Sequence, residues 1–240
     1  MKNSTKSVNI VTKERTRLFS EQKSPPPKMT NNKKAPEGTI SRLFIYLREI
    51  TALTKMNIHT ISSAELGERA NLSDAQVRKD LGYFGQFGVS GAGYDTGELK
   101  AALERILGKD KAWNVAIVGV GHLGSALLTY PGFKEHGLNI IAGFDSDARK
   151  IGRQVGEVAI QSMDELPKAI KEKRVSIGII AVPAQDAQEV ADKLIKARVE
   201  CILNFAPTTL SVPENIRVKD VDLSRELETL SYFLVDKKTS

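Results

Sequence analysis

Apolar residues recur at three- and four-residue steps from position 40 to position 50, which is the spacing of one face of a helix. The residues on this face are Ile40, Leu43, Phe44, Leu47 and Ile50. The pattern predicts an amphipathic helix that begins near Thr39 and ends near Thr54. The first folded part of the chain is therefore expected to be built around helices.

Two shorter helices are predicted next. Either Ser62 or Ser63 can cap the first, which should stop at Asn71. Ser73 is a favourable N-cap for the second, and Gln76 follows it at capping-box spacing. The buried side of this second helix is marked by Val77 and Leu81. Two short helices with a tight link between them predict a helix-turn-helix.

Residues 84–97 contain five glycines with Phe87, Val89 and Tyr94 between them. This composition predicts a small glycine-rich hairpin, followed by a helix over residues 97–108. The alternative is a flexible linker, but a linker has little use for Phe84, Phe87 and Tyr94. Three helices and a hairpin are the elements of a winged helix.

The second half of the chain alternates apolar strands with amphipathic helices. Strands are predicted at residues 115–118, 140–144, 158–160, 177–182 and 201–204, and helices at 123–129, 164–173 and 186–197. This alternation is typical of a parallel sheet that helices cover on both faces. The predicted fold class is α/β, with a winged helix-turn-helix domain followed by a Rossmann-type domain.

A last helix is predicted over residues 222–235, with no strand after it. One side of it carries Leu223, Leu227, Leu230, Phe233 and Leu234. An apolar helix at a terminus can pack either on its own domain or on a second subunit. The expected parts are a tail (1–36), a winged-helix domain (37–110), a Rossmann domain (111–220) and a C-terminal helix with its tail (221–240).

Charge is unevenly distributed along the 240 residues. The whole chain has a formal net charge of +6, and residues 1–36 alone carry nine Lys or Arg against two Glu, so the rest sums to −1. The first 36 residues are polar and include three consecutive prolines, which predicts a disordered tail. Translation from Met29 is an alternative that would remove most of this tail. The overall basicity therefore does not by itself indicate a nucleic-acid partner.

No apolar run approaches the roughly 20 residues of a membrane helix, and the first segment has no signal-peptide core, so a cytoplasmic protein is expected. The single cysteine, Cys201, lies in a predicted buried strand. A structural role is expected for it in preference to a reactive or metal-binding one. No metal site is predicted.

Gly119, Gly121 and Gly124 have the G-x-G-x-x-G spacing of a dinucleotide-binding turn. The turn follows a predicted strand and opens a helix, and Asp145 ends the next strand. In such a turn the first glycine allows the tight bend, the second lets the pyrophosphate approach the backbone, and the third lets helix and strand pack closely. The helix N-terminus supplies amides to the phosphates, and Asp145 would accept hydrogen bonds from the adenosine ribose.

NAD(H) is favoured over NADP(H), because a 2′-phosphate would meet Asp145 with Asp147 close behind. Arg149 and Lys150 favour the opposite choice. Two alternatives remain: the domain has kept the fold and lost its ligand, or it binds another nucleotide such as coenzyme A.

Catalysis is argued against by the residues that are missing. The chain has three histidines: His59 in the N-terminal domain, His136 after the first Rossmann helix, and His122 inside the glycine turn. None is placed to act as acid or base at a nicotinamide, and no further domain follows to hold a substrate. No catalytic residue is predicted.

The predicted recognition helix, residues 74–84, offers Gln76, Arg78 and Lys79 on its exposed face, with Tyr83 one turn on. Arginine can bind guanine O6 and N7 in a bidentate fashion, glutamine can pair with adenine, and lysine or tyrosine can hold phosphates. An ordinary solvated face is the alternative. The position of these residues on the second helix of a helix-turn-helix favours DNA binding.

Several motifs together resemble the Rex family of bacterial redox-sensing repressors. They are QVRKDLGYFG from Gln76, GAGY from Gly91, VGVGHLGSAL from Val118 with YPGF from Tyr130, AVP from Ala181 and ILNFAP from Ile202. The resemblance extends from about Ile40 to Leu234. It implies a homodimer that binds a palindromic operator through winged helices and is released by NADH.

The resemblance also implies roles for individual residues. Cofactor contacts are expected at Gly119, Val120, Gly121, His122, Leu123, Gly124, Asp145, Lys150, Ala181, Val182, Pro183, Asn204, Phe205 and Ala206. DNA contacts are expected at Ser73, Gln76, Arg78, Lys79, Tyr83, Ser90 and Gly91. Tyr130 and Asp222 match a pair that interacts across subunits, and the last helix matches one that is exchanged between subunits. This sequence departs from the family at Ser90, where many relatives are basic, and at Leu223, where some are aromatic.

These observations predict a repressor that senses the NADH/NAD⁺ ratio. Two rival hypotheses are an NAD-dependent oxidoreductase with an N-terminal dimerisation domain, and an interaction protein with a degenerate Rossmann domain. Steady turnover would indicate the first, and a lack of nicotinamide binding would indicate the second.

Overall fold

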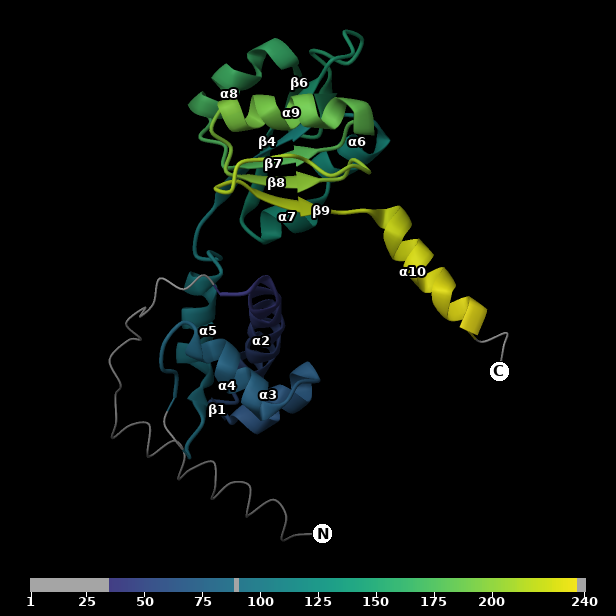
Figure 1. Cartoon of the computed structure of the whole chain (residues 1–240). Coiled ribbons are helices and arrows are strands. Elements are labelled where there is room, and N and C mark those ends of the chain that lie inside the picture. Colours follow the sequence, from purple (N-terminus) through teal and green to yellow (C-terminus); the bar gives the residue numbers. More distant parts are fainter. Residues whose placement is uncertain (1–34, 89–90, 237–240) are drawn as a thin grey trace. The chain divides into compact units, whose positions relative to one another are not determined.

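The computed structural model describes residues 35–88 and 91–236, which form two compact units. The first unit ends at Asp110 and the second begins at Lys111 (Figure 1). The predicted tail lies almost entirely outside the described residues, as do Val89 and Ser90. No helix among the described residues is long and apolar enough to cross a membrane.

The first unit contains four helices and two short strands within residues 35–88 and 91–110. Its elements are α2 (Glu37–Lys55), β1 (Thr60–Ile61), α3 (Ser63–Ala70), α4 (Asp74–Gly82), β2 (Tyr94–Asp95) and α5 (Thr96–Ile106). The core is formed by side chains from all four helices, with Leu43, Ile50, Leu66, Val77 and Leu103 among its members. The predicted helices are confirmed, each within one or two residues of its expected ends.

The buried face of α2 differs from the predicted one. Leu43, Leu47 and Ile50 are buried as expected, but the ring of Phe44 is 48% exposed. Tyr46 takes the place expected for Phe44 and is completely buried. Tyr46 was not among the residues of the predicted face, and its buried hydroxyl is satisfied by a hydrogen bond to Asp80.

Side-chain caps fix the ends of the two short helices. Ser62 and Glu65 form a reciprocal capping box at the start of α3, and Asn71 ends that helix in the left-handed conformation. The hydroxyl of Ser73 accepts a hydrogen bond from the backbone nitrogen of Gln76 at 3.1 Å. The link between α3 and α4 is therefore short and held at both ends, as a helix-turn-helix requires.

The predicted hairpin within residues 84–97 is wrong in its pairing. The described residues of that segment contain one strand, β2, which pairs antiparallel with β1 on the other side of the helix-turn-helix. Gly93, with φ +89°, makes this pairing possible, because a Cβ there would lie 2.5 Å from the carbonyl oxygen of Ile61. Gly93 thus allows the close approach to β1, and Gly88, with φ +72°, lies against the backbone of Gly93.

The second unit is built on a seven-stranded sheet. Its strands are β3 (Trp113–Val118), β4 (Leu138–Asp145), β5 (Gln154–Val155), β6 (Val158–Ser162), β7 (Ile177–Ile180), β8 (Cys201–Asn204) and β9 (Arg217–Asp220). The order is β5-β6-β4-β3-β7-β8-β9, and every neighbouring pair is parallel except β5 and β6. The five predicted strands are confirmed, whereas β5 and β9 were missed.

Helices cover both faces of this sheet. They are α6 (His122–Leu128), α7 (Pro131–Glu135), α8 (Leu166–Glu172) with the 3₁₀ turn η1 (Met163–Glu165) before it, and α9 (Ala184–Lys196). Helices α8 and α9 lie together on one face (Figure 1), where they pack into a core around Phe144 and Leu194. Leu127 and Leu128 of α6 pack with a second core around Ile117 on the other face. The predicted two-sided parallel sheet is confirmed.

Cys201 and the apolar side of the last helix are both exposed in the single chain. Cys201 lies in the predicted strand but is exposed, which corrects the expectation of a buried thiol. The helix α10 (Leu223–Asp236) forms as predicted, yet Leu223, Leu227 and Leu230 are between 59% and 67% exposed in the single chain. Of the two positions expected for this helix, its own domain does not bury the apolar side.

Candidate nucleotide site and nucleic-acid interface

The glycine turn follows β3 and leads into α6 at the centre of the sheet. Gly119 has φ +92°, and a Cβ there would lie 2.5 Å from the carbonyl oxygen of Ala181. A Cβ at Gly124 would collide with the carbonyl oxygen of Gly119, whereas one at Gly121 would meet nothing within 4 Å. The first and third glycines are thus required by close packing within the protein, and the second leaves the backbone open on the side of the cavity.

Asp145 ends β4 directly beside this turn and is only 7% exposed. Its carboxylate accepts hydrogen bonds from the backbone nitrogen of Val120 at 2.8 Å and from that of Asp147 at 2.9 Å. The ammonium group of Lys150 lies 2.8 Å from the same carboxylate. Burial by itself favours the neutral acid, but the hydrogen bonds from Lys150 and the two amides outweigh it and lower the pKa of Asp145. Asp145 is therefore ionised at neutral pH.

The next acidic side chain is paired as well. Arg149 forms two side-chain hydrogen bonds with Asp147, at 3.0 and 2.8 Å. These bonds, together with the one from the Arg149 backbone, lower the pKa of Asp147 to about 2. The arginine charge that favoured an NADP(H) site is thus already matched by a carboxylate.

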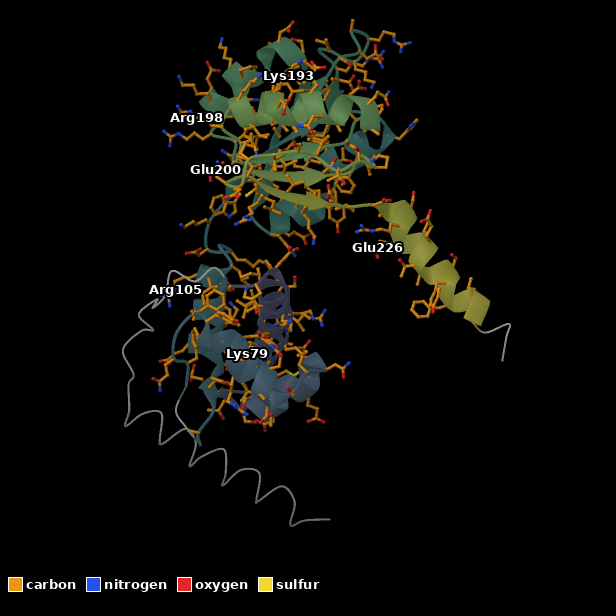
Figure 2. All side chains as sticks on the ribbon, viewed as in Figure 1. Lys79, Arg105, Lys193, Arg198, Glu200 and Glu226 are labelled. Carbon is orange, nitrogen blue, oxygen red and sulfur yellow. The ribbon has the colours of Figure 1, made fainter. Side chains whose placement is uncertain are left out.

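A cavity of about 500 Å³ opens next to the turn. Of the predicted cofactor residues, it is lined by Gly119, Gly121, Asp145, Lys150, Ala181, Val182 and Pro183. Asp147, expected close behind Asp145, lines it as well. The lining also includes residues that were not predicted, namely Val118, Ser146, Met163, Asp186, Glu189, Val190 and Lys193. Four of these seven belong to α9, on which Figure 2 labels Lys193. The sequence could have indicated the α9 residues, because this helix begins directly after the Ala-Val-Pro motif that was predicted to contact the cofactor.

The other predicted cofactor residues lie outside this lining. Val120 and Gly124 are buried behind the turn, and His122 and Leu123 are exposed at the start of α6. The Asn204 amide bonds to the backbone of Ala206 and to Asp220 at 2.8 Å. In this structure the Asn-Phe-Ala segment holds the turn after β8.

The two residues of the expected switch have separate partners within one chain. Tyr130 is 58% exposed, and its ring lies edge to face against Phe133 with the centroids 5.1 Å apart. Asp222 accepts hydrogen bonds from the backbone nitrogens of Ser224 and Arg225, at 3.0 and 3.1 Å, and so caps α10. Leu223, the first residue of α10, is 59% exposed.

The predicted recognition helix α4 exposes both of its basic residues. Lys79 is exposed and is labelled in Figure 2. Arg78 is exposed too, and its guanidinium bonds to Asp74 on the preceding turn and to Ser63 at the start of α3. Tyr83 is half-buried at the C-terminal end of α4, and Ser73 is exposed at its N-terminal end. Positive charge is thus displayed along the exposed side of the helix.

The position of Gln76 differs from the predicted one. Its side-chain nitrogen donates to the carboxylate of Asp80 at 2.8 Å, and the residue is half-buried. The prediction placed Gln76 on the exposed face, and it could not foresee the partner because Asp80 looks like a surface residue in the sequence. One of the two N–H donors of the Gln76 amide is thus engaged within the protein, while its second N–H and its oxygen take no part in that bond.

A buried carboxylate joins α4 to α2. Asp80 is completely buried and accepts hydrogen bonds from Thr39, Arg42 and Tyr46 of α2. The bond to Arg42 is bidentate, with Nε and Nη2 at 2.6 and 2.7 Å from the two carboxylate oxygens. Burial favours the neutral acid, but these bonds and the one from Gln76 lower the pKa of Asp80. The recognition helix is therefore fixed to α2 by an ionic contact inside the core.

A second cavity, of about 700 Å³, lies beside α4. It is lined by residues of α4, of the start of α3 and of the glycine-rich segment, among them Ser62, Ser63, Arg78, Gly85, Gln86 and Gly91. Of the two predicted wing contacts, Gly91 lies in this lining, and Ser90 falls outside the described residues. The serines at the start of α3 were not predicted as part of this surface.

Two family models match parts of the chain. Residues 34–82 match a putative DNA-binding protein N-terminus, and residues 110–208 match a CoA binding domain. The redox-sensing transcriptional repressor Rex of Desulforamulus reducens is 46% identical over 205 residues, which cover 85% of this chain and 98% of that protein. The Rex protein of Carboxydothermus hydrogenoformans is 48% identical over 199 residues, 83% and 96% of the two chains.

The chain belongs to the Rex family. Solved structures agree with this result. The crystal structure of RSP in complex with β-NAD⁺ and operator DNA matches with a TM-score of 0.82 at 36% identity, over 87% of this chain and 96% of that one. The complex of RSP with β-NADH matches with a TM-score of 0.75 at 34% identity, over 87% and 98%. RSP is itself described as a Rex-family repressor.

Membership in the Rex family settles several of the predictions. The predicted family is confirmed, and so is the α/β fold with an N-terminal DNA-binding domain and a C-terminal Rossmann-like domain. Rex proteins are transcriptional repressors, so the hypothesis of an oxidoreductase is set aside.

Proposed function

We propose that this chain represses transcription as a homodimer that binds operator DNA through α4 and is released when NADH binds at the glycine turn. The observation that carries the proposal is the ionised Asp145 beside an open Gly121, in a chain whose other unit displays Arg78 and Lys79 on a helix-turn-helix. Repression of chromosomal genes places its action in the cytoplasm.

The cavity beside the turn fits a dinucleotide. Open space in front of Gly121 allows a pyrophosphate to approach the backbone at the N-terminus of α6, where free amides favour an anion. Asp145 is held by Val120 and Lys150 at the position where the adenosine ribose of a dinucleotide lies in this fold. With Asp147 also ionised, a 2′-phosphate would be repelled, so NAD(H) is preferred to NADP(H).

The nicotinamide end of the site favours the reduced cofactor. Ala181, Val182 and Pro183 line the cavity at the end of β7 with apolar groups. These three residues offer no partner to the positive charge of the oxidised ring, and burying an unpaired charge against them is costly; the carboxylates of Asp186 and Glu189 line another part of the cavity wall. We therefore expect NADH to bind more tightly than NAD⁺.

The DNA contact is proposed for the exposed side of α4. Arg78 and Lys79 lie on the second helix of a helix-turn-helix, which enters the major groove in this class of domain. Ser73 and Tyr83 lie at its two ends, suited to phosphate contacts. Gly91 is the proposed contact of the glycine-rich segment, and Ser90, also proposed, lies outside the described residues. A homodimer would present two such helices about 34 Å apart, one turn of DNA, to an inverted repeat.

The C-terminal helix supplies the proposed dimer contact. Its apolar side chains stay exposed in one chain, and they include Leu227, Leu230, Phe233 and Leu234, each at least 58% exposed. Exchange of α10 between two subunits would bury them and would bring Asp222 of one subunit toward Tyr130 of the other. That contact is the proposed part of the switch that responds to the cofactor.

Repression and cofactor binding are then linked. If NADH binding moves the two recognition helices away from the spacing of adjacent major grooves, it lowers the affinity for DNA. DNA must then lower the affinity for NADH by the same factor. The reciprocity gives a second way to measure the same coupling.

The test is DNA binding of the full chain to a two-fold operator duplex, followed by fluorescence anisotropy, with NADH, NAD⁺ and NADPH titrated separately. Release by NADH at concentrations where the other two leave the complex intact supports the proposal. Asp145→Ala should need more NADH for release, whereas Asp164→Ala, the same change at an exposed position outside the cavity, should behave as the wild type. DNA binding that is indifferent to all three nucleotides would overturn the proposed sensor.

A further inference from the structure

Arg78 is held at one corner by two side chains. Its Nη1 atom lies 2.7 Å from the carboxylate of Asp74, one turn earlier on α4, and 2.9 Å from the hydroxyl of Ser63 at the start of α3. The side chains of Arg78 and Asp74 are 54% and 46% exposed. An ion pair this exposed contributes little to folding stability. Its effect is therefore expected on what the surface of α4 binds.

The opposite edge of the same guanidinium is open. The structure gives Nε and Nη2 of Arg78 no acceptor among residues 35–88 and 91–236. Nε and Nη2 form the edge that makes two parallel hydrogen bonds, and Arg42 uses that edge on Asp80. Asp74 and Ser63 therefore hold the one corner that a side-on bidentate contact does not need.

A guanidinium fixed in this way is suited to guanine. Guanine presents O6 and N7 in the major groove as two neighbouring acceptors, and arginine binds them in a bidentate fashion. A mobile arginine at the same position would reach a phosphate equally well, which adds affinity for every sequence and no discrimination. The carboxylate of Asp74 also opposes contact of the Arg78 guanidinium with phosphate oxygens, because it is bonded to that guanidinium.

We propose that Asp74 is a specificity-determining residue: it positions Arg78, together with Ser63, so that the Nε and Nη2 edge reads a guanine in the operator. The inference rests on the proposed function, since it requires α4 to enter the major groove. Asp74 has the further effect of weakening non-specific binding, because its charge opposes contact between Arg78 and phosphates.

The test compares Asp74→Asn with a matched control, Glu104→Gln. Glu104 pairs with Lys100 at 2.6 Å across the same four-residue spacing, on α5 of the same unit, so both variants lose one negative charge and one i,i+4 pair. Dissociation constants of the full chain are measured for an inverted-repeat duplex, selected from a random library by the wild type, and for a duplex of unrelated sequence. Thermal unfolding is recorded to show that both variants fold.

For Asp74→Asn we expect tighter binding to the unrelated duplex and a lower ratio of non-specific to operator dissociation constants. An exposed pair of this spacing is worth about a factor of two, and a dimer has two of them, so the ratio should fall about fourfold. The salt dependence of non-specific binding should steepen by about 0.9 for each phosphate contact that Arg78 gains. Glu104→Gln should leave the ratio unchanged.

Replacing each operator guanine in turn by 7-deazaguanine, which lacks N7, tests the contact itself. At the guanine that Arg78 reads, the replacement should weaken wild-type binding more than it weakens binding of Asp74→Asn. If the wild type selects a duplex but Asp74→Asn has the same ratio of non-specific to operator dissociation constants, this inference alone is overturned. A wild type that selects no duplex at all would overturn the proposed function, and the inference with it.

Discussion

The buried carboxylate of Asp80 lends itself to a quantitative test through Asp80→Asn. The side chain is completely buried, and it accepts five hydrogen bonds, two of them from Arg42 and one each from Thr39, Tyr46 and Gln76. Asparagine has the same shape but no charge, and it turns one acceptor oxygen into an NH₂ group that faces donors. Whichever way the amide is oriented, at least two of the five bonds are lost, one of them from Arg42.

The expected cost follows from these losses. A hydrogen bond to a charged group contributes about 1.5–3 kcal/mol to stability, so two of them give about 3–6 kcal/mol. The Arg42 side chain is 28% exposed and can recover part of its hydration, which favours the lower end, about 3 kcal/mol. For a domain of this size, 1 kcal/mol corresponds to about 4–8 °C in melting temperature, so the first unit should melt about 12–24 °C lower.

The two units can be followed separately in one sample. The single tryptophan, Trp113, lies in β3 of the second unit, so its fluorescence reports that unit, while far-ultraviolet circular dichroism reports the helices of both. Asp80→Asn should lower the melting transition seen by circular dichroism and leave the tryptophan transition in place. Asp164→Asn is the control, because that exposed position should change stability by less than about 0.5 kcal/mol.

The loss should also depend on pH. Because the pKa of Asp80 in the folded protein lies below its ordinary value of 3.8, the carboxylate adds stability above pH 3.8, and this stability is lost as the pH falls through the folded pKa. The difference between wild type and Asp80→Asn should therefore be full at pH 7 and shrink below about pH 4. A difference of less than about 1 kcal/mol at pH 7, as found for surface pairs, would refute the reasoning.

Further predictions concern the second unit. Gly124→Ala places a methyl group against the backbone of Gly119, so the turn must move. The NADH affinity, measured by calorimetry, should therefore fall at least tenfold. An unchanged affinity would contradict the role of this turn. Asp145→Ala should weaken NADH binding and narrow the preference for NADH over NADPH, measured by nucleotide fluorescence, whereas a preserved preference would move the discrimination elsewhere. The double variant Leu227→Asp with Leu230→Asp changes side chains that are exposed in one chain, so sedimentation should find a folded monomer in place of a dimer.

The elements that the sequence predicted well are those with a local cause. The caps at Ser62 and Ser73 and the glycine at 124 act within a few residues of their own position, so their effect can be recognised in one sequence. The five central strands are continuous apolar runs, because they are covered on both faces. Asp145 followed from its fixed distance to the turn.

The elements that were missed depend on residues far apart in the chain. Strand β9 begins with Arg217 and is mostly exposed, so it has no apolar signal and exists through its pairing with β8. Gln76 was expected on the exposed face and Tyr46 was left out of the buried face. Both bond to the buried Asp80, which lies 34 residues from Tyr46, so neither contact has a local signal. The pairing of β2 with β1 joins segments on either side of two helices.

The contact between Gly119 and Ala181 restricts how this protein can evolve. A Cβ at position 119 would lie 2.5 Å from the Ala181 carbonyl oxygen, and the backbone there is left-handed, so any other residue must displace the loop after β7. The loop that would hold the phosphates and the loop that would face the nicotinamide therefore share one wall. A change in one loop is therefore restricted by the other. A change of cofactor preference is easier to reach through Asp147, whose side chain bonds to Arg149 and to neither loop.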